Sequence, residues 1–299
     1  MKYLLLYNPV SGRSTIKWKL PEIIKLFKEY NKELDVYASK KKNDLEEEAY
    51  LKASLYDVFL ICGGDGSINE VINGVMKSEK KPHIGVIPCG TANDIAAILG
   101  IPKNYKKAIK MYFEIEPTYI DINQMNDRYF VYAAASGVLS KISYDISRRS
   151  LNKYGYLAYF FEGMKDLAKD YKYHVDITYD GGTLSTECMM VMGLSSNRVG
   201  GMTLSKFSNS KLNDGLFELR VFTRKRAFKR FRYLSSFIRG GKKLREDYHI
   251  TSSHFVIKTD ELIKWNTDGE EGMKGNIEIT VLKEALSVYM NPKVKKKYL

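Results

Sequence analysis

The feature that most constrains this chain is a glycine-dense turn between an apolar run and a helix-like segment. The run Val58–Cys62 has the length and composition of a buried strand, and it breaks at Gly63–Ser67 before an amphipathic pattern begins at Ile68. Glycines lack a Cβ, so those of the turn can adopt positive φ and bring their amide groups close to an anion. A following helix directs its positive N-terminal end to the same place. This segment therefore predicts a phosphate-binding turn at the end of a strand.

Short apolar runs and helical patterns alternate along the first third of the chain. Such alternation is typical of an α/β domain with a parallel sheet and helices on both faces. The segments, in order, are Tyr3–Tyr7, Leu20–Tyr30, Leu34–Ala38, Leu45–Ala53, Val58–Cys62, Ile68–Met76 and His83–Ile87.

Three polar, glycine-bearing segments follow strand-like runs of this first part. They are Asn8–Gly12, Gly63–Ser67 and Pro88–Asp94. In open parallel sheets, ligands bind beyond the carboxyl ends of the strands. We therefore expect the three segments to face one crevice.

Beyond about Tyr119 the pattern changes to short alternating runs separated by turn signals such as Asp180–Gly182 and Asn213–Gly215. This pattern favours an antiparallel, β-sandwich-like domain, with helical interruptions near Tyr154–Tyr171 and Lys225–Arg239. We expect an N-terminal domain over residues 1–120, a β-rich domain over 121–285, and a C-terminal segment, 286–299, that could return to the first domain.

Composition excludes several classes of protein. With 299 residues and 44% hydrophobic content, the chain can form substantial cores. No stretch approaches the roughly 20 apolar residues of a membrane-spanning helix, and the N-terminus is too soon polar for a signal peptide. We therefore expect a cytoplasmic protein without a transmembrane segment. The three cysteines, Cys62, Cys89 and Cys188, are widely separated, which suggests reduced thiols.

The formal net charge is +13, which implies attraction to an anionic partner. Ten Lys and Arg residues lie between Arg224 and Arg245 without an intervening acid, and apolar residues recur among them at helical spacing. Two interpretations remain open for this basic amphipathic helix: a domain helix with a solvated outer face, or a contact with a membrane surface. The closing Lys293–Tyr298 is expected to be an ordinary solvated tail. No nucleic-acid-binding motif stands out, so nucleic acid is not an expected partner.

Four motifs together carry a resemblance to a known family. They are Asn8-Pro-x-Ser-Gly12, Gly63-Gly-Asp-Gly-Ser-Ile-Asn-Glu70, Pro88-x-Gly-Thr-Ala-Asn-Asp94 and Asn266-Thr-Asp-Gly-Glu270. In this order and spacing they resemble the soluble bacterial diacylglycerol kinases, a lipid kinase family that includes sphingosine and ceramide kinases. The Gly-Gly-Asp-Gly element is also shared with NAD kinases and phosphofructokinases.

The resemblance implies an α/β nucleotide domain like that of phosphofructokinases and NAD kinases, followed by the β-rich domain. It implies a lipid kinase that uses ATP and Mg²⁺ to phosphorylate a lipid hydroxyl, with diacylglycerol as the favoured acceptor and phosphatidic acid as its product. A sphingoid lipid or NAD as acceptor, and a nucleotide-binding protein without catalysis, are the alternatives. The lipid would be met by transient peripheral association with the inner face of the membrane, and a homodimer is compatible with the sequence.

The nucleotide-binding residues follow from the motifs. Pro9 fixes the first turn and Gly12 lets amides approach phosphate, whereas Ser39 is carried over from the family at the end of the second strand. A plain strand-to-helix turn is the alternative for the first motif. The full set is Asn8, Pro9, Ser11, Gly12, Ser39, Gly63, Gly64, Asp65, Gly66, Ser67, Asn69, Glu70, Gly90 and Thr91.

A carboxylate beside phosphate needs a cation between them, so Asp65 implies magnesium as well as a part in catalysis. The resemblance places Asp65 with Asp94 and Asp121 around the catalytic Mg²⁺, although an Asx turn would also explain each of these residues. The resemblance further suggests a second, structural Mg²⁺ at Lys211, Asp214 and Leu216, where a simple turn is the alternative.

Phosphoryl transfer to an alcohol requires a group that accepts the hydroxyl proton. By resemblance, Asp268 or Glu270 is that acceptor, and we favour Asp268 with Glu270 beside it. A solvated hairpin turn is the alternative, because Asp-Gly is a strong turn signal. The four histidines adjoin no motif and are expected to be structural.

Overall fold

The computed structural model describes residues 1–11, 16–137, 172–207, 211–223, 227–260 and 262–299, apart from the side chains of 227–231 and 234. Gly12 and the predicted helix Tyr154–Tyr171 therefore lie outside the described residues. The chain forms two compact units. Unit 1 contains Met1–Ile122 and Lys283–Leu299, and unit 2 contains Asn123–Leu282. Each unit is described by itself below.

Unit 1 is built on a parallel sheet, as predicted. The strands β1 (Tyr3–Tyr7), β2 (Leu34–Ala38), β3 (Val58–Gly63) and β4 (His83–Pro88) lie in the order β4-β3-β1-β2. Every residue of β1 and β3 is buried, which is typical of parallel strands covered on both faces. Apolar, partly β-branched runs suit these positions because both faces of the strand must pack.

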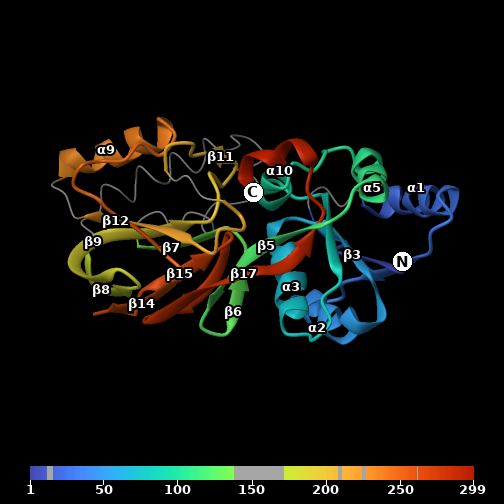
Figure 1. Ribbon diagram of the computed structural model, residues 1–299, viewed down its shortest axis with the longest axis horizontal. Helices are drawn as coiled ribbons and strands as arrows, with labels where there is room; N and C mark the ends of the chain where they lie inside the picture. Colours follow the sequence, from blue (N-terminus) through green and yellow to red (C-terminus); the bar gives the residue numbers. More distant parts are fainter. Residues whose placement is uncertain (12–15, 138–171, 208–210, 224–226, 261) are drawn as a thin grey trace. The chain divides into compact units, whose positions relative to one another are not determined.

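Helices cover both faces of this sheet (Figure 1). On one face, α1 (Ile16–Glu29) and α5 (Tyr105–Glu114) contact β1, where Tyr3 meets Phe27 and Phe113 edge to face with centroids 5.2 and 6.0 Å apart. On the other lie α2 (Asp44–Lys52), followed by the short η1 (Ala53–Leu55), and α3 (Asp65–Met76). A Cβ on Gly74 would strike the carbonyl of Glu46, so this glycine lets α2 and α3 pack closely.

The end of the chain completes unit 1. Strand β17 (Ile277–Val288) finishes beside β4, where Val288 pairs in parallel with Ile84. The basic segment expected to be a solvated tail forms a helix, α10 (Pro292–Tyr298), without a buried residue. The side chain of Asn291 accepts a hydrogen bond from the N–H of Lys293 at 3.0 Å, and Pro292 occupies the first turn, so the sequence contains both signals that start a helix.

Unit 2 is an antiparallel sheet with one long central strand. Strand β9 (Gly182–Leu194) pairs with β8 (Tyr173–Tyr179), β7 (Ala133–Gly137) and β12 (Phe217–Thr223), and β8 continues through β14 (His254–Thr259) to the first part of β17. The remaining strands are β5 (Thr118–Met125), which begins in unit 1, β6 (Arg128–Phe130), β10 (Arg198–Val199), β11 (Met202–Thr203), β13 (Tyr248–Ser252), β15 (Lys264–Thr267) and β16 (Glu270–Lys274). The prediction of a parallel α/β part followed by an antiparallel part is confirmed.

Aromatic side chains form the centre of the unit 2 core. Phe217 packs edge to face against Phe130 and Phe255, with centroids 5.5 and 6.3 Å apart, and Trp265 is fully buried with its indole N–H donating to the carbonyl of Gly275 at 3.0 Å. Helix α9 (Ala227–Ile238) packs on β12, where Phe222 contacts Tyr233 and Phe237. Among the described residues, no helix is both long and apolar enough to cross a bilayer.

The cysteines differ in part from expectation. Cys188 is buried and free, but Cys62 and Cys89 are paired as a disulfide with their Cα atoms 6.0 Å apart. The two residues are 27 positions apart in the sequence. However, Cys62 of β3 pairs with Ile87 of the neighbouring β4, and Cys89 directly follows the last residue of β4. The prediction of three reduced thiols is therefore wrong for this pair, because sequence distance hides the neighbouring strands.

Candidate active site

Three loops meet beyond the carboxyl ends of β1, β3 and β4, and hydrogen bonds join them. The N–H of Asn8 donates to the carbonyl of Cys62 at 3.3 Å, and the N–H of Cys89 donates to the carbonyl of Gly63 at 3.1 Å. The hydroxyl of Ser11 accepts from the N–H of Gly64 at 3.1 Å. Within the first loop, the side chain of Asn8 accepts from the N–H of Val10 at 3.0 Å. The predicted gathering of these segments is thus present in unit 1.

The glycines of these loops are needed for close approach rather than for unusual dihedral angles. Gly64 is extended, with φ −92° and ψ −175°, and none of Gly63, Gly64, Gly66 and Gly90 has a positive φ. The expectation of positive φ in the turn is therefore wrong. A Cβ on Gly90 would lie 2.5 Å from the Cα of Gly64, and one on Gly63 would lie 2.5 Å from the Cβ of Ser67. A side chain at Gly90 would force two loops apart, and one at Gly63 would displace Ser67 in the first turn of α3.

The first turn of α3 provides backbone donors at this place. The helix begins at Asp65, and the residue before it, Gly64, has no side chain that could cap the helix. The first intrahelical hydrogen bond runs from the N–H of Ile68 to the carbonyl of Gly64 at 3.1 Å. The amides of a helix's first turn have no partner within the helix. They and the helix dipole favour an anion at the mouth of the three loops.

Asp65 and Asp94 lie close together behind the glycine turn. The carboxylate of Asp65, half-buried, accepts from the N–H of Ile95 at 3.0 Å, and Asp94 is 1% exposed at the start of α4 (Asp94–Ile98). Burial is the main cause that raises the pKa of Asp65 to about 6, and the neighbouring negative charge of Asp94 adds to it, against the opposing effect of the backbone hydrogen bonds. Two carboxylates in such a place suit a bound cation, because its charge would offset their repulsion.

The other two predicted metal-binding carboxylates, Asp121 and Asp214, accept hydrogen bonds from the backbone. Asp121 is buried, and its carboxylate accepts from the N–H of Glu284 at 2.7 Å. At the second predicted site, the carboxylate of Asp214 accepts from the N–H of Leu216 at 3.0 Å, which is an Asx-type turn, and Lys211 is exposed. Across the part of the chain that the structure describes, no three His, Cys, Asp or Glu side chains form a group that could hold a metal ion.

The acidic turn in unit 2 is a two-residue hairpin with a buried carboxylate. Thr267 of β15 pairs with Glu270 of β16, and the two turn residues Asp268 and Gly269 have φ of 51° and 91°, as a type I′ turn requires. Asp268 is only 2% exposed. The alternative of a solvated turn therefore describes the backbone but not the carboxylate.

Three backbone N–H groups hold the Asp268 carboxylate. Its oxygens accept from Val131 at 2.6 Å, Tyr132 at 3.0 Å and Ala133 at 3.1 Å. Charge-assisted hydrogen bonds of this kind are short and strong, so they fix the position of a carboxylate. Glu270 is exposed beside this turn. The turn thus presents one buried carboxylate and one exposed carboxylate.

The remaining predicted nucleotide residues have mixed surroundings. Ser39 directly follows β2, with its N–H donating to the carbonyl of Tyr7 at 2.9 Å, and Thr91 is exposed in the third loop. Asn69 is buried and accepts from the side chain of Asn73 at 3.0 Å within α3, which is a structural contact. Glu70 is half-buried one position further along the helix.

One residue that holds the third loop was not singled out from the sequence. Asn93 has φ 51°, and its side chain accepts from the N–H of Gly90 and donates to the carbonyl of Gly90, both at 2.7 Å. Asn tolerates this left-handed conformation better than most residues. Its position directly before the helix-starting Asp94 was the available signal.

Comparisons with known proteins identify the family. Residues 2–125 match the model of the diacylglycerol kinase catalytic domain. A diacylglycerol kinase of Staphylococcus carnosus (strain TM300) is 31% identical over 97% of this chain and 95% of its own, and one of Bacillus subtilis (strain 168) is 33% identical over 90% and 89%.

Solved structures give the same result. The crystal structure of a diacylglycerol kinase from Bacillus anthracis str. Sterne is 25% identical, with a TM-score of 0.75 over 98% of both chains. Another crystal structure from this organism has a TM-score of 0.84 at 25% identity and the same coverage. The fold and its glycine-lined loops are those of a phosphotransferase. The chain belongs to the diacylglycerol kinase family and is a kinase.

Proposed function

We propose that this kinase transfers the γ-phosphoryl group of ATP, with Mg²⁺, to the hydroxyl of a lipid, and that its acceptor is diacylglycerol. The observation that carries the proposal is the joining of three loops over the N-terminus of α3, next to the Asp65–Asp94 pair. Backbone donors suit the phosphates, and the paired carboxylates suit a divalent cation. The names of the relatives support diacylglycerol as the acceptor.

In this proposal the loops of unit 1 hold the nucleotide. The amides of Gly66 and Ser67 in the first turn of α3 would bind phosphate oxygens, with Asn8 and Ser11 shaping the first loop, Gly63 and Gly64 the second, and Gly90 and Thr91 the third. Asp65 and Asp94 would hold Mg²⁺, which neutralises charge on the transferring phosphate. Asp121, and the turn at Lys211, Asp214 and Leu216, remain candidates for the ligand sets that the sequence suggested.

The turn of unit 2 would serve the acceptor. The hydroxyl oxygen forms a bond to the γ-phosphorus while the bond to the β-phosphate oxygen breaks, so ADP leaves and the hydroxyl proton needs an acceptor. Three backbone N–H groups hold the Asp268 carboxylate in one orientation, and a carboxylate is an acceptor to which a hydroxyl can donate. A loose transition state needs positioning more than strong basicity. We therefore assign Asp268 to orient the hydroxyl and accept its proton, with Glu270 beside it.

Because a lipid acceptor lies in a bilayer, the proposal includes transient association with an acidic membrane surface, for which the net charge of +13 gives a physical reason.

Label transfer tests the proposal. Purified protein is incubated with γ-labelled ATP, Mg²⁺ and mixed micelles of diacylglycerol or sphingosine, or with NAD, alongside Asp65→Asn, Asp268→Asn and Glu270→Gln. We expect label in diacylglycerol, its loss with EDTA and recovery with Mg²⁺, and a fall of ~10²–10⁴-fold in Asp268→Asn. Label in NAD alone, or in no acceptor, would contradict the proposed function.

A further inference from the structure

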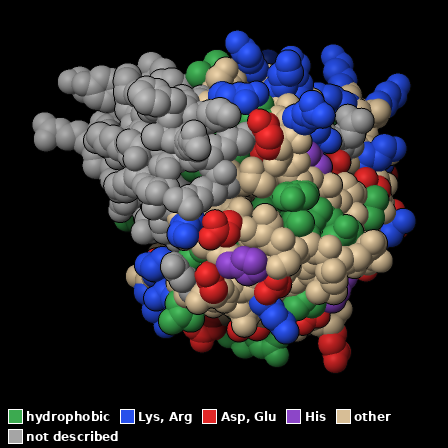
Figure 2. Space-filling model, turned by 90° about the vertical axis from the view of Figure 1, so that its left-hand side faces the viewer, with side chains coloured by type: hydrophobic (Ala, Val, Ile, Leu, Met, Phe, Trp, Pro, Cys, Tyr) green, Lys and Arg blue, Asp and Glu red, His purple; other side chains and the backbone are tan. Residues whose placement is uncertain are grey.

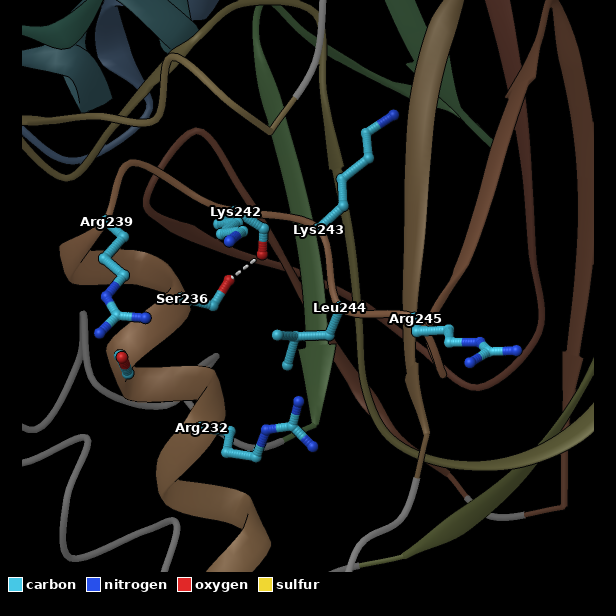
Figure 3. Close-up of a pocket in the computed structure, with 8 residues that line it drawn as sticks. Arg232, Ser236, Arg239, Lys242, Lys243, Leu244 and Arg245 are labelled. Atoms are coloured by element: carbon cyan, nitrogen blue, oxygen red, sulfur yellow. Dashed lines mark hydrogen bonds between the residues drawn. The ribbon is translucent and has the colours of Figure 1, made fainter.

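Unit 2 contains a basic pocket that the proposed reaction does not use. A cavity of about 230 Å³ lies between the second half of α9 and the segment that follows it, and Figure 3 shows its lining. Five of the lining residues are cationic, namely Arg232, Arg239, Lys242, Lys243 and Arg245. We call this cavity the α9 pocket. At ~30 Å³ for each water, its volume equals roughly eight waters, which leaves room for a phosphate group.

A buried ion pair next to the α9 pocket holds the pocket's backbone in place. Arg220 of β12 is 1% exposed, and its guanidinium donates to the carboxylate of Asp247 at 2.8 Å and to the carbonyls of Gly241 and Lys242 at 2.9 and 3.1 Å. Tyr233 of α9 donates to the same carboxylate at 3.0 Å. These bonds join β12, α9 and residues 239–247, which we call the basic segment. The backbone around the pocket is therefore held in place without a ligand.

The end of α9 is closed by backbone and hydroxyl bonds. The N–H groups of Gly241 and Lys242 donate to the carbonyl of Ser236 at 2.8 and 3.1 Å, and the hydroxyl of Ser236 donates to the carbonyl of Lys242 (Figure 3). Gly240 and Gly241 both have φ 78°, a conformation that glycine adopts without strain. The main chain therefore satisfies the carbonyl of Ser236, and the cationic side chains of the pocket are not needed to cap it.

The cations of the pocket have little acidic compensation. Arg232 pairs with Glu246 at 3.3 Å, with both side chains about half exposed, and Asp247 is taken up by Arg220 and Tyr233. Among the described residues, no carboxylate pairs with Arg239, Lys242, Lys243 or Arg245. The positive field reaches His249, because Arg220 and Lys243 add to the effect of burial in lowering its pKa to about 4.

The directions of the side chains separate a pocket core from its rim. In Figure 3, Arg232 and Arg239 extend from the helix and Lys242 lies beside Ser236, whereas Lys243 and Arg245 point away from the helix. Figure 2 shows Lys and Arg side chains gathered along the upper edge of one face of the molecule. A favourable interaction with the negative C-terminal end of α9 explains one or two such cations but not five around a cavity.

An exposed apolar residue adjoins the pocket. Ile238, the last residue of α9, is 65% exposed and directly precedes Arg239. A bulky apolar side chain beside clustered cations is the combination that interfacial helices present to acidic lipids, because the cations meet the headgroups while the apolar group enters the boundary region. A free anion in water would use the cations alone.

We propose that the α9 pocket binds the phosphate of an acidic phospholipid at a bilayer surface. Arg232, Arg239 and Lys242 contact the phosphate oxygens, and Ile238 rests at the headgroup boundary. The proposal deepens the membrane association in the proposed function and rests on it only for the choice of a lipid as ligand.

Sedimentation with vesicles of phosphatidylcholine, with and without phosphatidylglycerol, tests the pocket in the full-length protein. The variant Arg239→Gln/Lys242→Gln is compared with a control that removes equal charge from α10, Lys295→Gln/Lys296→Gln. We expect the first to weaken binding to phosphatidylglycerol vesicles by about tenfold or more and the control by less than about twofold. Arg239→Lys, which keeps the charge but loses the two-pronged guanidinium, should weaken binding by roughly threefold.

Failure of the pocket proposal and failure of the proposed kinase function would give different results. Equal loss in both double variants, or no loss in the first, would overturn the pocket, since binding would then follow net charge or another surface. Calorimetric binding of inorganic phosphate without any vesicle binding would overturn the assignment to lipid. Phosphorylation of diacylglycerol in detergent micelles is measured in parallel and should be retained in every pocket variant. Failure of that reaction in the unmodified protein would count against the proposed function and leave the vesicle result intact.

Discussion

The Asp268 carboxylate illustrates how a turn residue becomes a site residue. An Asp-Gly hairpin turn normally leaves its carboxylate in water, but here the backbone of Val131–Ala133 replaces the water with three N–H donors. The N–H of Asp268 also donates to the carbonyl of Ala133 at 2.9 Å, so the turn is fixed from both sides. A buried, fully oriented carboxylate can meet a substrate hydroxyl without first losing conformational freedom.

Replacing Asp268 should therefore affect stability as well as turnover. In Asp268→Asn, one backbone donor would face an amide NH₂ group and the other bonds would lose their charge assistance. We expect the free energy of unfolding to fall by ~1–3 kcal/mol. Glu270→Gln, at an exposed position, should stay within about 0.5 kcal/mol of the unmodified protein. Urea unfolding measures both, and an unchanged stability in Asp268→Asn would show that the three bonds contribute little.

His249 should make stability depend on pH. Burial, with Arg220 and Lys243, lowers its pKa in the folded protein to about 4, whereas the unfolded chain has a value of ~6.5. The unfolded state therefore binds the proton more readily, and stability falls as the pH drops from about 6.5 to about 4. Because part of the His249 side chain stays in contact with solvent, screening should keep the loss below ~1 kcal/mol.

Urea unfolding at several pH values would reveal this contribution. In His249→Gln, the part of the pH dependence between about 6.5 and 4 that belongs to His249 should disappear. An identical slope in the unmodified protein and the variant would mean that the folded and unfolded states protonate His249 equally.

At the level of elements, the site of unit 1 depends on how closely two loops approach. Gly90 and Gly64 face each other. A Cβ added to Gly90 would lie 2.5 Å from the Cα of Gly64, whereas a Cβ added to Gly64 would lie 3.3 Å from the Cα of Gly90, so the first is far more crowded. The crowded atoms are backbone, which cannot move aside as a flexible side chain can. Loop spacing, and with it the position of the amides, is therefore sensitive to one methyl group.

This asymmetry predicts an order of effects on nucleotide binding. Gly90→Ala should lower the affinity for Mg·ADP by about tenfold or more, because a shift near 1 Å misplaces the phosphate donors. Gly64→Ala should have a smaller effect. Calorimetry measures both, with thermal unfolding as a check that the sheet is intact. The reverse order would mean that the loops are spaced differently when nucleotide binds.

The contact between β12 and the basic segment should carry much of the local stability of unit 2. Arg220→Met keeps the aliphatic bulk over Phe222, whose ring lies 4.6 Å from the guanidinium carbon, but it leaves Asp247 buried without its cation. We expect a loss of ~3–5 kcal/mol. Arg232→Met, which removes the exposed partner of Glu246, should cost less than ~1 kcal/mol. Equal effects in denaturant unfolding would mean that Arg220 is better hydrated than its burial indicates.

Periodicity predicts the strands of unit 1 well because each is a short run buried on both faces. The predicted Tyr3–Tyr7 and Leu34–Ala38 coincide with β1 and β2, and Val58–Cys62 differs from β3 by one residue. The start of α3 was set three residues too late, at Ile68 instead of Asp65, because the glycine turn itself forms the first turn of the helix. Helix α10 was missed because it is short and has only Val294 and Tyr298 as bulky apolar residues among its lysines.

The candidate site was predicted only in part, for physical reasons. Strand order brings together segments that follow β1, β3 and β4, so their meeting could be expected from the alternation of elements. The proximity of Cys62 to Cys89 and the donors around Asp268 depend on strand neighbours and loop paths, which local patterns do not contain. The role of Asn93 depends on a left-handed dihedral angle, for which Asn is only a weak signal.

For the whole molecule, the dominant property is its excess of positive charge. The formal net charge of +13 comes from 48 Lys and Arg against 35 Asp and Glu. Basic clusters occur in both units, namely the α9 pocket in unit 2 and helix α10 in unit 1. A field of one sign over the surface raises the rate of encounter with acidic membranes, while local sites determine how long the protein remains bound.

Association with acidic vesicles should therefore weaken as salt is added. The distance over which exposed charges act shrinks from ~10 Å at 0.1 M salt to ~3 Å at 1 M, so the long-range attraction is lost first and contacts within the α9 pocket persist longest. Sedimentation with phosphatidylglycerol vesicles across this range should show a steep fall in the bound fraction, and the Arg239→Gln/Lys242→Gln variant should lose binding at lower salt. Vesicles of phosphatidylcholine alone provide the control. Binding that is independent of salt would mean that apolar insertion, by residues such as Ile238, outweighs the charge.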